Sequence, residues 1–203
     1  MIADDAREPT IVTLKLSDKA SAEFGLQCCG GEVTLLLEPL PVIPSVAIFG
    51  MGHVGLELAR ILSRHDLELF LIDSRAEMLS DERLDGIRDA AARVHVHRAV
   101  APESVLPELP AATHVLVMTH DHAEDIAVCD SALRREGLAS IGLIGSTAKW
   151  TSFRKKLSAE GHSARDLERI TTPIGIPGLT AKEPAVIAVS VAAALLMAFE
   201  EPD

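Results

Sequence analysis

The feature that most constrains this chain is a glycine pattern between an apolar run and a helical segment. Gly50-Met-Gly-His-Val-Gly55 follows the apolar residues 46–49 and opens a helical pattern that extends from about His53 to Arg64. In this context the first glycine makes a tight turn, the second lets the backbone approach a phosphate, and the third lets the helix pack on the strand. The pattern predicts a strand–turn–helix unit whose helix N-terminus favours an anion.

From Ser45 onward the chain alternates strand-like apolar runs with segments of helical pattern. The strands are predicted at residues 46–49, 67–72, 93–97, 114–118 and 140–144, and the helices at about 53–64, 103–109, 122–136, 147–160 and 184–199. This alternation requires crossover connections and therefore a parallel sheet. We predict an α/β fold over residues 45–203: a doubly wound, Rossmann-like, mostly parallel sheet with helices on both faces.

Residues 1–41 have a different pattern and are predicted to form a short β-rich segment. Two β-like runs, Ile11–Leu16 and Val33–Leu37, flank the segment Gly25-Leu-Gln-Cys-Cys-Gly-Gly31. Prolines at positions 39, 41 and 44 follow, as in a linker.

The charge balance excludes one class of partner. Nineteen Lys and Arg against 30 Asp and Glu give a net charge of −11, whereas a nucleic-acid binder neutralises phosphates with cations. The longest uncharged stretch, residues 184–199, is shorter than the ~20 residues of a membrane-spanning helix. The acidic N-terminus does not resemble a signal peptide, and three cysteines make no disulfide framework. We expect a soluble, cytoplasmic protein with no nucleic-acid or membrane partner.

Ligands of open α/β sheets bind beyond the C-terminal ends of the strands, so four segments should converge there. They are the glycine loop, Thr119-His-Asp-His122, Ile144-Gly-Ser146 and Thr172-Pro-Ile-Gly175. Thr119 and Ser146 stand where helix N-caps are expected. His120 and His122, with Asp121 between them, could hold a metal, but one such pair in a turn lacks the spacing of a closed site.

Asp73 ends the second predicted strand of the sheet, near the spacing at which an acidic residue accepts from a ribose hydroxyl. Arg75 could instead neutralise a phosphate. The last helix is apolar nearly all round, so it is expected either in the core of one chain or at a subunit interface. The second possibility would make the protein a homodimer.

The cysteines fall into two classes. Cys28 and Cys29 are adjacent, and in a reducing cell their ordinary uses are burial, soft-metal ligation or sulfur chemistry. Cys129 shares a helical face with Ile126 and Leu133, a pattern typical of core.

In this order, the motifs resemble those of the XdhC/CoxI family. They are Gln27-Cys-Cys-Gly-Gly-Glu-Val-Thr34, Gly50-Met-Gly-His-Val-Gly55, Asp73-Ser-Arg75, Thr119-His-Asp-His122, Ile141-Gly-Leu-Ile-Gly-Ser146 and Pro173-Ile-Gly-Ile-Pro-Gly178. Family members usually carry a longer region before the cysteine pair, and many have a cysteine where Thr172 stands here.

The resemblance implies an accessory chaperone rather than an enzyme. Such a protein binds and protects molybdenum cofactor (molybdopterin) while a cysteine desulfurase supplies sulfur, and delivers it to a molybdenum hydroxylase such as xanthine dehydrogenase. The family's cysteine pair corresponds to Cys28 and Cys29, as transient molybdenum ligands. The implied cofactor site comprises Gly50, Gly52, His53, Gly55, Asp73, Arg75, Thr119, His120, Asp121, His122, Gly145 and Ser146.

Two other functions remain open from the sequence. An NAD(P)-dependent oxidoreductase would use the glycine loop and Asp73, with His120 or His122 as proton donor, but the chain contains no tyrosine and no catalytic Lys or Tyr motif. A ligand-sensing domain that signals through a partner would need only the glycine loop.

Overall fold

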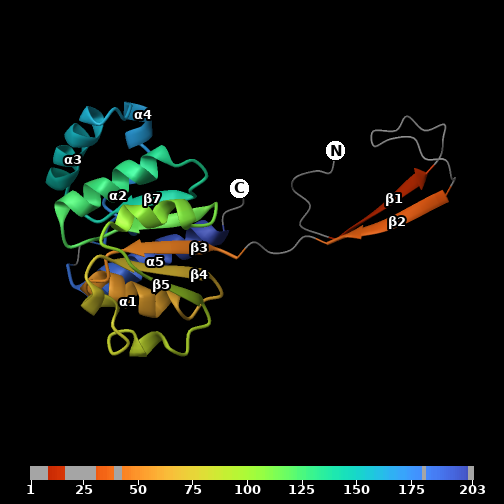
Figure 1. The fold of residues 1–203 in the computed structure, drawn as a ribbon, viewed down its shortest axis with the longest axis horizontal. Coiled ribbons are helices and arrows are strands. Elements are labelled where there is room, and N and C mark those ends of the chain that lie inside the picture. The colour runs from red at the N-terminus through yellow and green to blue at the C-terminus, as the bar shows by residue number, and fades with distance from the viewer. Residues whose placement is uncertain (1–8, 17–30, 39–42, 180–181, 201–203) are drawn as a thin grey trace. The chain divides into compact units, whose positions relative to one another are not determined.

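The computed structural model describes residues 9–16, 31–38, 43–179 and 182–200, and the chain divides into two units after residue 42. In the first unit β1 (Thr10–Leu16) pairs with β2 (Gly31–Leu37) in an antiparallel hairpin, with Thr10 opposite Leu37 (Figure 1). Both predicted runs are therefore strands. Cys28 and Cys29 lie outside the described residues.

The second unit is built on one six-stranded parallel sheet. Its strands are β3 (Ser45–Phe49), β4 (Glu68–Asp73), β5 (Arg93–Arg98), β6 (Thr113–Val117), β7 (Ser140–Leu143) and β8 (Ile170–Thr171). Their order is β5-β4-β3-β6-β7-β8, the Rossmann arrangement in which the chain reverses direction across the sheet between β3 and β6. The predicted doubly wound parallel sheet is confirmed, and β8 is the one strand that the sequence pattern did not predict.

Helices cover both faces of this sheet. They are α1 (His53–Leu62), α2 (His122–Arg134), α3 (Thr147–Ala159), α4 (Ala164–Leu167) and α5 (Pro184–Glu200), with 3-10 turns η1 (Ala76–Leu79), η2 (Asp85–Ile87) and η3 (Pro102–Glu108). Helices α1 and α5 lie on one face and α2 and α3 on the other (Figure 1). The segment predicted as a helix at 103–109 is the 3-10 turn η3.

Successive side chains of a strand point to opposite faces of the sheet and so contribute to two hydrophobic cores. On β3, Val46 and Ile48 point to the core beneath α1 and α5, whereas Ala47 and Phe49 point to the core beneath α2 and α3. All four side chains are fully buried, as expected of a central parallel strand covered on both faces.

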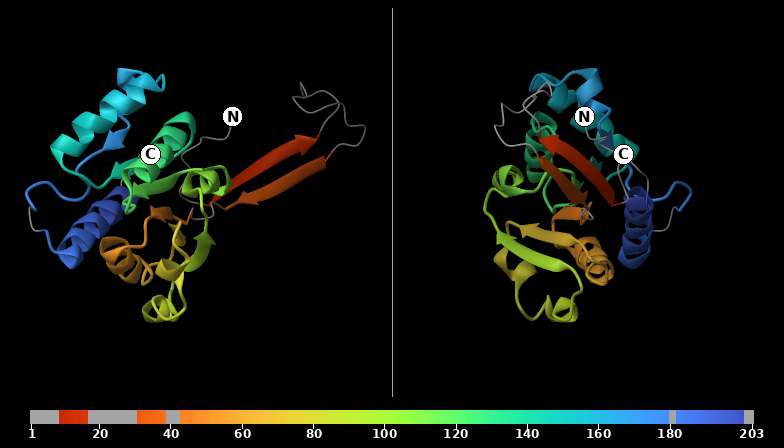
Figure 2. Two further views of the ribbon diagram at one scale, coloured as in Figure 1. Left: turned by 60° about the vertical axis from the view of Figure 1, so that its left-hand side comes forward. Right: turned by 90° about the vertical axis from the view of Figure 1, so that its right-hand side faces the viewer.

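Helix α5 packs against α1 and lies beside it in space (Figure 2). It buries one face, including Ala188, Val191 and Leu195, but leaves Val189 and Met197 more than half exposed. In the part of the chain that the structure describes, no helix has the length and apolarity to cross a membrane.

Candidate functional site

Two of the three loop glycines are required by packing alone. Gly50 has φ of 110°, and a Cβ there would lie 2.3 Å from the carbonyl oxygen of Met118, at the end of β6. A Cβ on Gly55 would lie 2.1 Å from the carbonyl oxygen of Gly50. These glycines bring the start of α1 against β3 and β6, where the strand order reverses.

Gly52 is different, because nothing lies within 4 Å of the position a Cβ would occupy. It is the N-cap residue of α1, and among the described residues no side chain caps this helix end. The first N–H groups of a helix have no partner within it, and its dipole places partial positive charge there. The loop therefore presents open space and unsatisfied donors at the same point.

The next two helices along the chain are capped by their own residues. The Asp121 carboxylate accepts from the N–H of Ala123 at 2.7 Å and of Glu124 at 3.1 Å, and these bonds lower the pKa of Asp121. The Ser146 hydroxyl accepts from the N–H of Lys149 at 3.3 Å, as predicted.

The expectation that Thr119 caps α2 is wrong. Its hydroxyl donates instead to the Asp125 carboxylate at 2.8 Å, and Asp125 also accepts from the Thr119 N–H at 3.0 Å. Lys149 donates to the other Asp125 oxygen at 2.6 Å and to the carbonyl of Ile144 at 2.9 Å. This buried ion pair joins the ends of β6 and β7, and sequence reasoning missed it because its two members lie on different helices.

A cavity of about 250 Å³ opens beside the α1 N-terminus. The segments that follow β3, β4 and β6 line it: Gly52, His53, Arg75, Met78, Arg83, Met118, Thr119 and His120. Two arginines line it and, among the described residues, no carboxylate does; Asp73 offsets the charge of Arg75, whereas Arg83 has no ion-pair partner there. The cavity is therefore suited to an anionic group.

Arg83 is a site residue that sequence reasoning did not identify. Its guanidinium donates to the carbonyl of Met51 at 3.1 Å and to that of Met78 at 3.4 Å. The first bond fixes the cation against the glycine loop. No motif marks position 83, which lies between η1 and η2; Met78 and Met118 were missed for the same reason.

Asp73 supports the site rather than lining it. Its carboxylate, 2% exposed, accepts from the Met51 N–H at 2.7 Å, the Arg75 N–H at 2.9 Å and two Arg75 guanidinium nitrogens at 3.0 Å. Burial would raise the pKa of Asp73, but the hydrogen bonds from Arg75 and Met51 outweigh it and lower the pKa. Four bonds use the roughly four acceptor positions of a carboxylate, so none is left for a ribose hydroxyl.

Of the other predicted residues, Asp121, His122, Gly145 and Ser146 are not among the residues that line the cavity. The His120 ring, which does line it, has its Nδ1 3.5 Å from Glu124. His122 meets the Phe153 ring edge-on, and Gly145 approaches the Lys149 side chain. Among the described residues no group of three or more His, Cys, Asp or Glu side chains is placed to hold a metal ion.

Cys129 is fully buried on α2, as its helical pattern predicts. Burial raises the pKa of its thiol to about 12. A thiol that stays protonated at neutral pH is a poor nucleophile and metal ligand. Cys129 is therefore a core residue.

Comparison with known proteins agrees with this architecture. The Escherichia coli (strain K12) protein named "Uncharacterized protein YqeB" is 24% identical over 190 residues, which are 94% of this chain and 34% of that protein. The chain thus spans about a third of the length of this relative.

Two solved structures are also similar. A Bacillus halodurans protein described as a xanthine dehydrogenase superposes with a TM-score of 0.60 and 22% identity, covering 82% of this chain and 45% of that chain, and so shares the fold. A metagenomic short-chain oxidoreductase in complex with NADP reaches a TM-score of 0.48 at 22% identity, covering 77% of this chain and 91% of that chain, too low for a functional comparison. Residues 46–195 match the model of the XdhC Rossmann domain, and the chain therefore belongs to the XdhC family.

Proposed function

We propose that this chain binds molybdenum cofactor as cargo and delivers it to a molybdenum hydroxylase such as xanthine dehydrogenase. The observation that carries the proposal is the uncapped N-terminus of α1, which opens onto a cavity lined by Arg83, a cation without an ion-pair partner among the described residues. Molybdopterin ends in a phosphate, and a helix N-terminus with nearby arginines is a favourable environment for that group.

The open position at Gly52 fits this ligand. Because nothing lies within 4 Å of a Cβ position there, a phosphate oxygen can approach the backbone as closely as the glycine fingerprint requires. The cavity, about 250 Å³, is slightly smaller than the ~300–1,000 Å³ of pockets that enclose a whole small molecule. We therefore propose that this cavity holds only the phosphate arm of the cofactor.

The molybdenum end of the cargo would need soft ligands. We propose Cys28 and Cys29 for this role, as transient ligands while a cysteine desulfurase supplies the terminal sulfur. Thiolate is the protein ligand that best matches a soft, sulfur-bound metal. Cys129 is unsuitable because it is buried with a raised pKa.

The saturated Asp73 favours a carrier over an NAD(P)-dependent oxidoreductase. A dinucleotide enzyme uses the acidic residue at this strand end to hold the ribose hydroxyls. Here Arg75 and the Met51 N–H occupy that carboxylate. Binding a ribose in the usual way would require breaking the Asp73–Arg75 pair.

The test is cofactor retention by Arg83→Gln. The protein is purified from a molybdenum-replete host, denatured and oxidised, and its pterin is measured by fluorescence. We expect near-stoichiometric pterin in the wild type and much less pterin per protein in the variant. The loss corresponds to about a tenfold lower affinity, the scale of a lost charge-assisted hydrogen bond. Arg88→Gln is the matched control, since Arg88 is exposed and pairs only with Asp85 among the described residues. Wild-type protein that carries no pterin but binds NAD(H) tightly would refute the carrier function.

The cysteine pair is tested in the same preparation. Replacing Cys28 and Cys29 with Ser should lower molybdenum per folded protein without changing the melting temperature. Cys129→Ser is the control: a buried hydroxyl without a partner costs roughly 1–3 kcal/mol of stability, and the metal content of the folded fraction should not change. Unchanged molybdenum in the double variant would remove the thiol role.

A further inference from the structure

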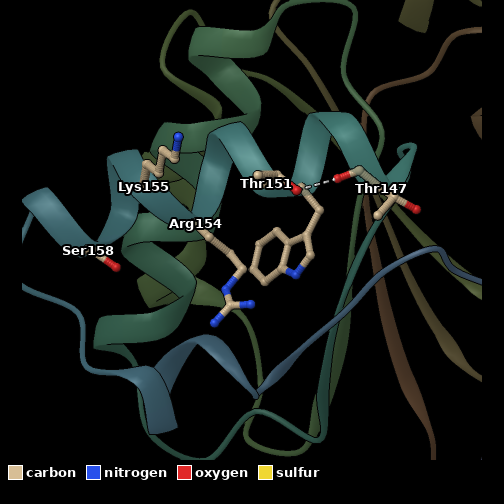
Figure 3. A pocket seen from close by; sticks show the side chains of 6 residues that line it. Thr147, Thr151, Arg154, Lys155 and Ser158 are labelled. Atoms are coloured by element: carbon tan, nitrogen blue, oxygen red, sulfur yellow. Dashed lines mark hydrogen bonds between the residues drawn. The ribbon is translucent and has the colours of Figure 1, made fainter.

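The outer face of α3 carries a second hollow, separate from the cavity at the glycine loop. Its volume is about 620 Å³, and side chains at helical spacing line it: Thr147, Trp150, Thr151, Arg154, Lys155 and Ser158. Figure 3 shows the labelled members of this set projecting from one helix. We call this surface the α3 face.

The charge of α3 is opposite to that of the whole chain. The helix contains Lys149, Arg154, Lys155 and Lys156 and no acidic residue, whereas the chain has a net charge of −11. Lys149 is neutralised by Asp125. The other three side chains are exposed, and within the described part of the chain none has an ion-pair partner.

Several exposed arginines elsewhere on the surface are arranged differently. Arg60, Arg64, Arg88, Arg93 and Arg134 each pair with a nearby carboxylate. Arg165, Arg169 and Lys182 are also exposed without an ion-pair partner among the described residues, but they are separated along the chain, whereas α3 carries three such cations in succession and no acidic residue. This helix therefore has a local positive potential. Such a potential attracts an acidic partner and orients it.

Trp150 adds an apolar anchor to this positive surface. It is half-buried, packs against the core beneath α2 and α3, and lines the hollow. Tryptophan and arginine are the side chains most enriched among residues that dominate binding energy. An indole held by the core can receive a side chain from a partner without losing its own freedom on binding.

We propose that the α3 face docks an acidic segment of a partner protein, with a large apolar side chain of that segment on Trp150 and its carboxylates on Arg154 and Lys155. This proposal does not rest on cofactor binding. It concerns another surface, although Thr147 directly follows Ser146, the residue that caps α3.

Trp150 makes the test direct because it is the only tryptophan in the chain. The full-length protein is titrated with a short Glu-rich peptide that carries one Phe, and Trp150 fluorescence is recorded at low and high salt. We expect a saturable fluorescence change that weakens with salt. The double variant Arg154→Glu/Lys155→Glu should lower the affinity at least about tenfold, because like charges then face each other.

Two controls separate a specific site from general charge attraction. Lys182→Glu reverses the charge of an exposed cation outside α3, as each substitution of the double variant does, and should leave the affinity unchanged. A peptide with Gln in place of each Glu should not bind. The proposal is overturned if Trp150 does not respond to the acidic peptide, if the double variant binds as the wild type does, or if vesicles containing phosphatidylserine change the fluorescence and the peptide does not. A loss of self-association in the double variant, with no peptide binding, would also overturn it and assign the face to a second copy of the chain.

Discussion

The turns after β3 and β6 are stabilised in the same way. After each strand the chain turns into a helix, and a buried aspartate accepts the N–H of the turn: Asp73 binds the N–H of Met51, and Asp125 binds that of Thr119. Each carboxylate is paired with a cation, Arg75 or Lys149. The two turns are thus held by equivalent ion pairs.

The helix that follows each turn differs. Asp121 caps α2, so the donors at that N-terminus are used within the chain. Gly52 leaves α1 without a side-chain cap and opens its N-terminus onto the arginine-lined cavity. Fold stability alone would favour a cap at both helices. The difference supports the proposal that the donors of α1 bind a ligand.

The largest expected effect concerns the ion pair after β6. In Asp125→Ala, Lys149 loses its counter-charge while its side chain is only 14% exposed, so the variant should lose about 3–5 kcal/mol of unfolding free energy. Urea denaturation measures this loss. Asp85→Ala is the control, because the Asp85–Arg88 pair is exposed and its removal should change stability by less than about 0.5 kcal/mol. A similar small change in both variants would mean that Asp125 does not hold the turn.

The Asp73–Arg75 pair, which holds the turn after β3, is expected to make the unfolding free energy depend on pH. The pKa of Asp73 is lower in the folded protein than in the unfolded chain. Its stabilisation is therefore complete above the unfolded-state pKa, near 4, and is lost as pH falls through the lower folded-state pKa. Asp73→Asn should cost roughly 1–3 kcal/mol at neutral pH, the scale of hydrogen bonds to a charged group.

The difference in unfolding free energy between the wild type and Asp73→Asn should shrink as the pH is lowered from 5 to about 2. Urea denaturation across this range measures it. A difference that stays constant with pH would show that the Asp73 charge does not contribute to stability.

Much of the unit that contains the six-stranded sheet could be predicted from the sequence, because periodicity and glycine spacing are local properties. The parallel sheet, its helices, the glycine turn and the burial of Cys129 all follow from patterns within a few residues. Arg83 and the Asp125–Lys149 pair could not be predicted, since their roles depend on which strand ends meet at the switch between β3 and β6. The error at Thr119 arose from a competition between neighbouring polar residues: Asp121 lies one residue before α2, where a cap must be.

Removing the α2 cap should have a smaller effect than either ion pair. Asp121→Ala leaves the N–H groups of Ala123 and Glu124 without their acceptor, which costs about 1 kcal/mol of stability. Thermal unfolding measures the loss. Because Asp121 does not line the cavity, ligand affinity should be unchanged in the folded protein. A fall in affinity without a fall in stability would instead place Asp121 in the binding site.

The smallest expected change in stability, and the sharpest test of the comparison, comes from giving α1 the cap that α2 has. Gly52 has φ of −67°, which any residue adopts, and its Cβ position is empty, so Gly52→Asp can be built without strain. Stability should change by only a few tenths of a kcal/mol, since glycine is already a fair N-cap. The new carboxylate would accept from the donors proposed for the phosphate and would repel it, so pterin retention should be abolished. Gly52→Asn is the matched control: it adds the cap without the charge, and should lower retention less than Asp does. If the Asp variant retains cofactor as the wild type does, the α1 N-terminus is not the phosphate site, and the missing cap needs another explanation.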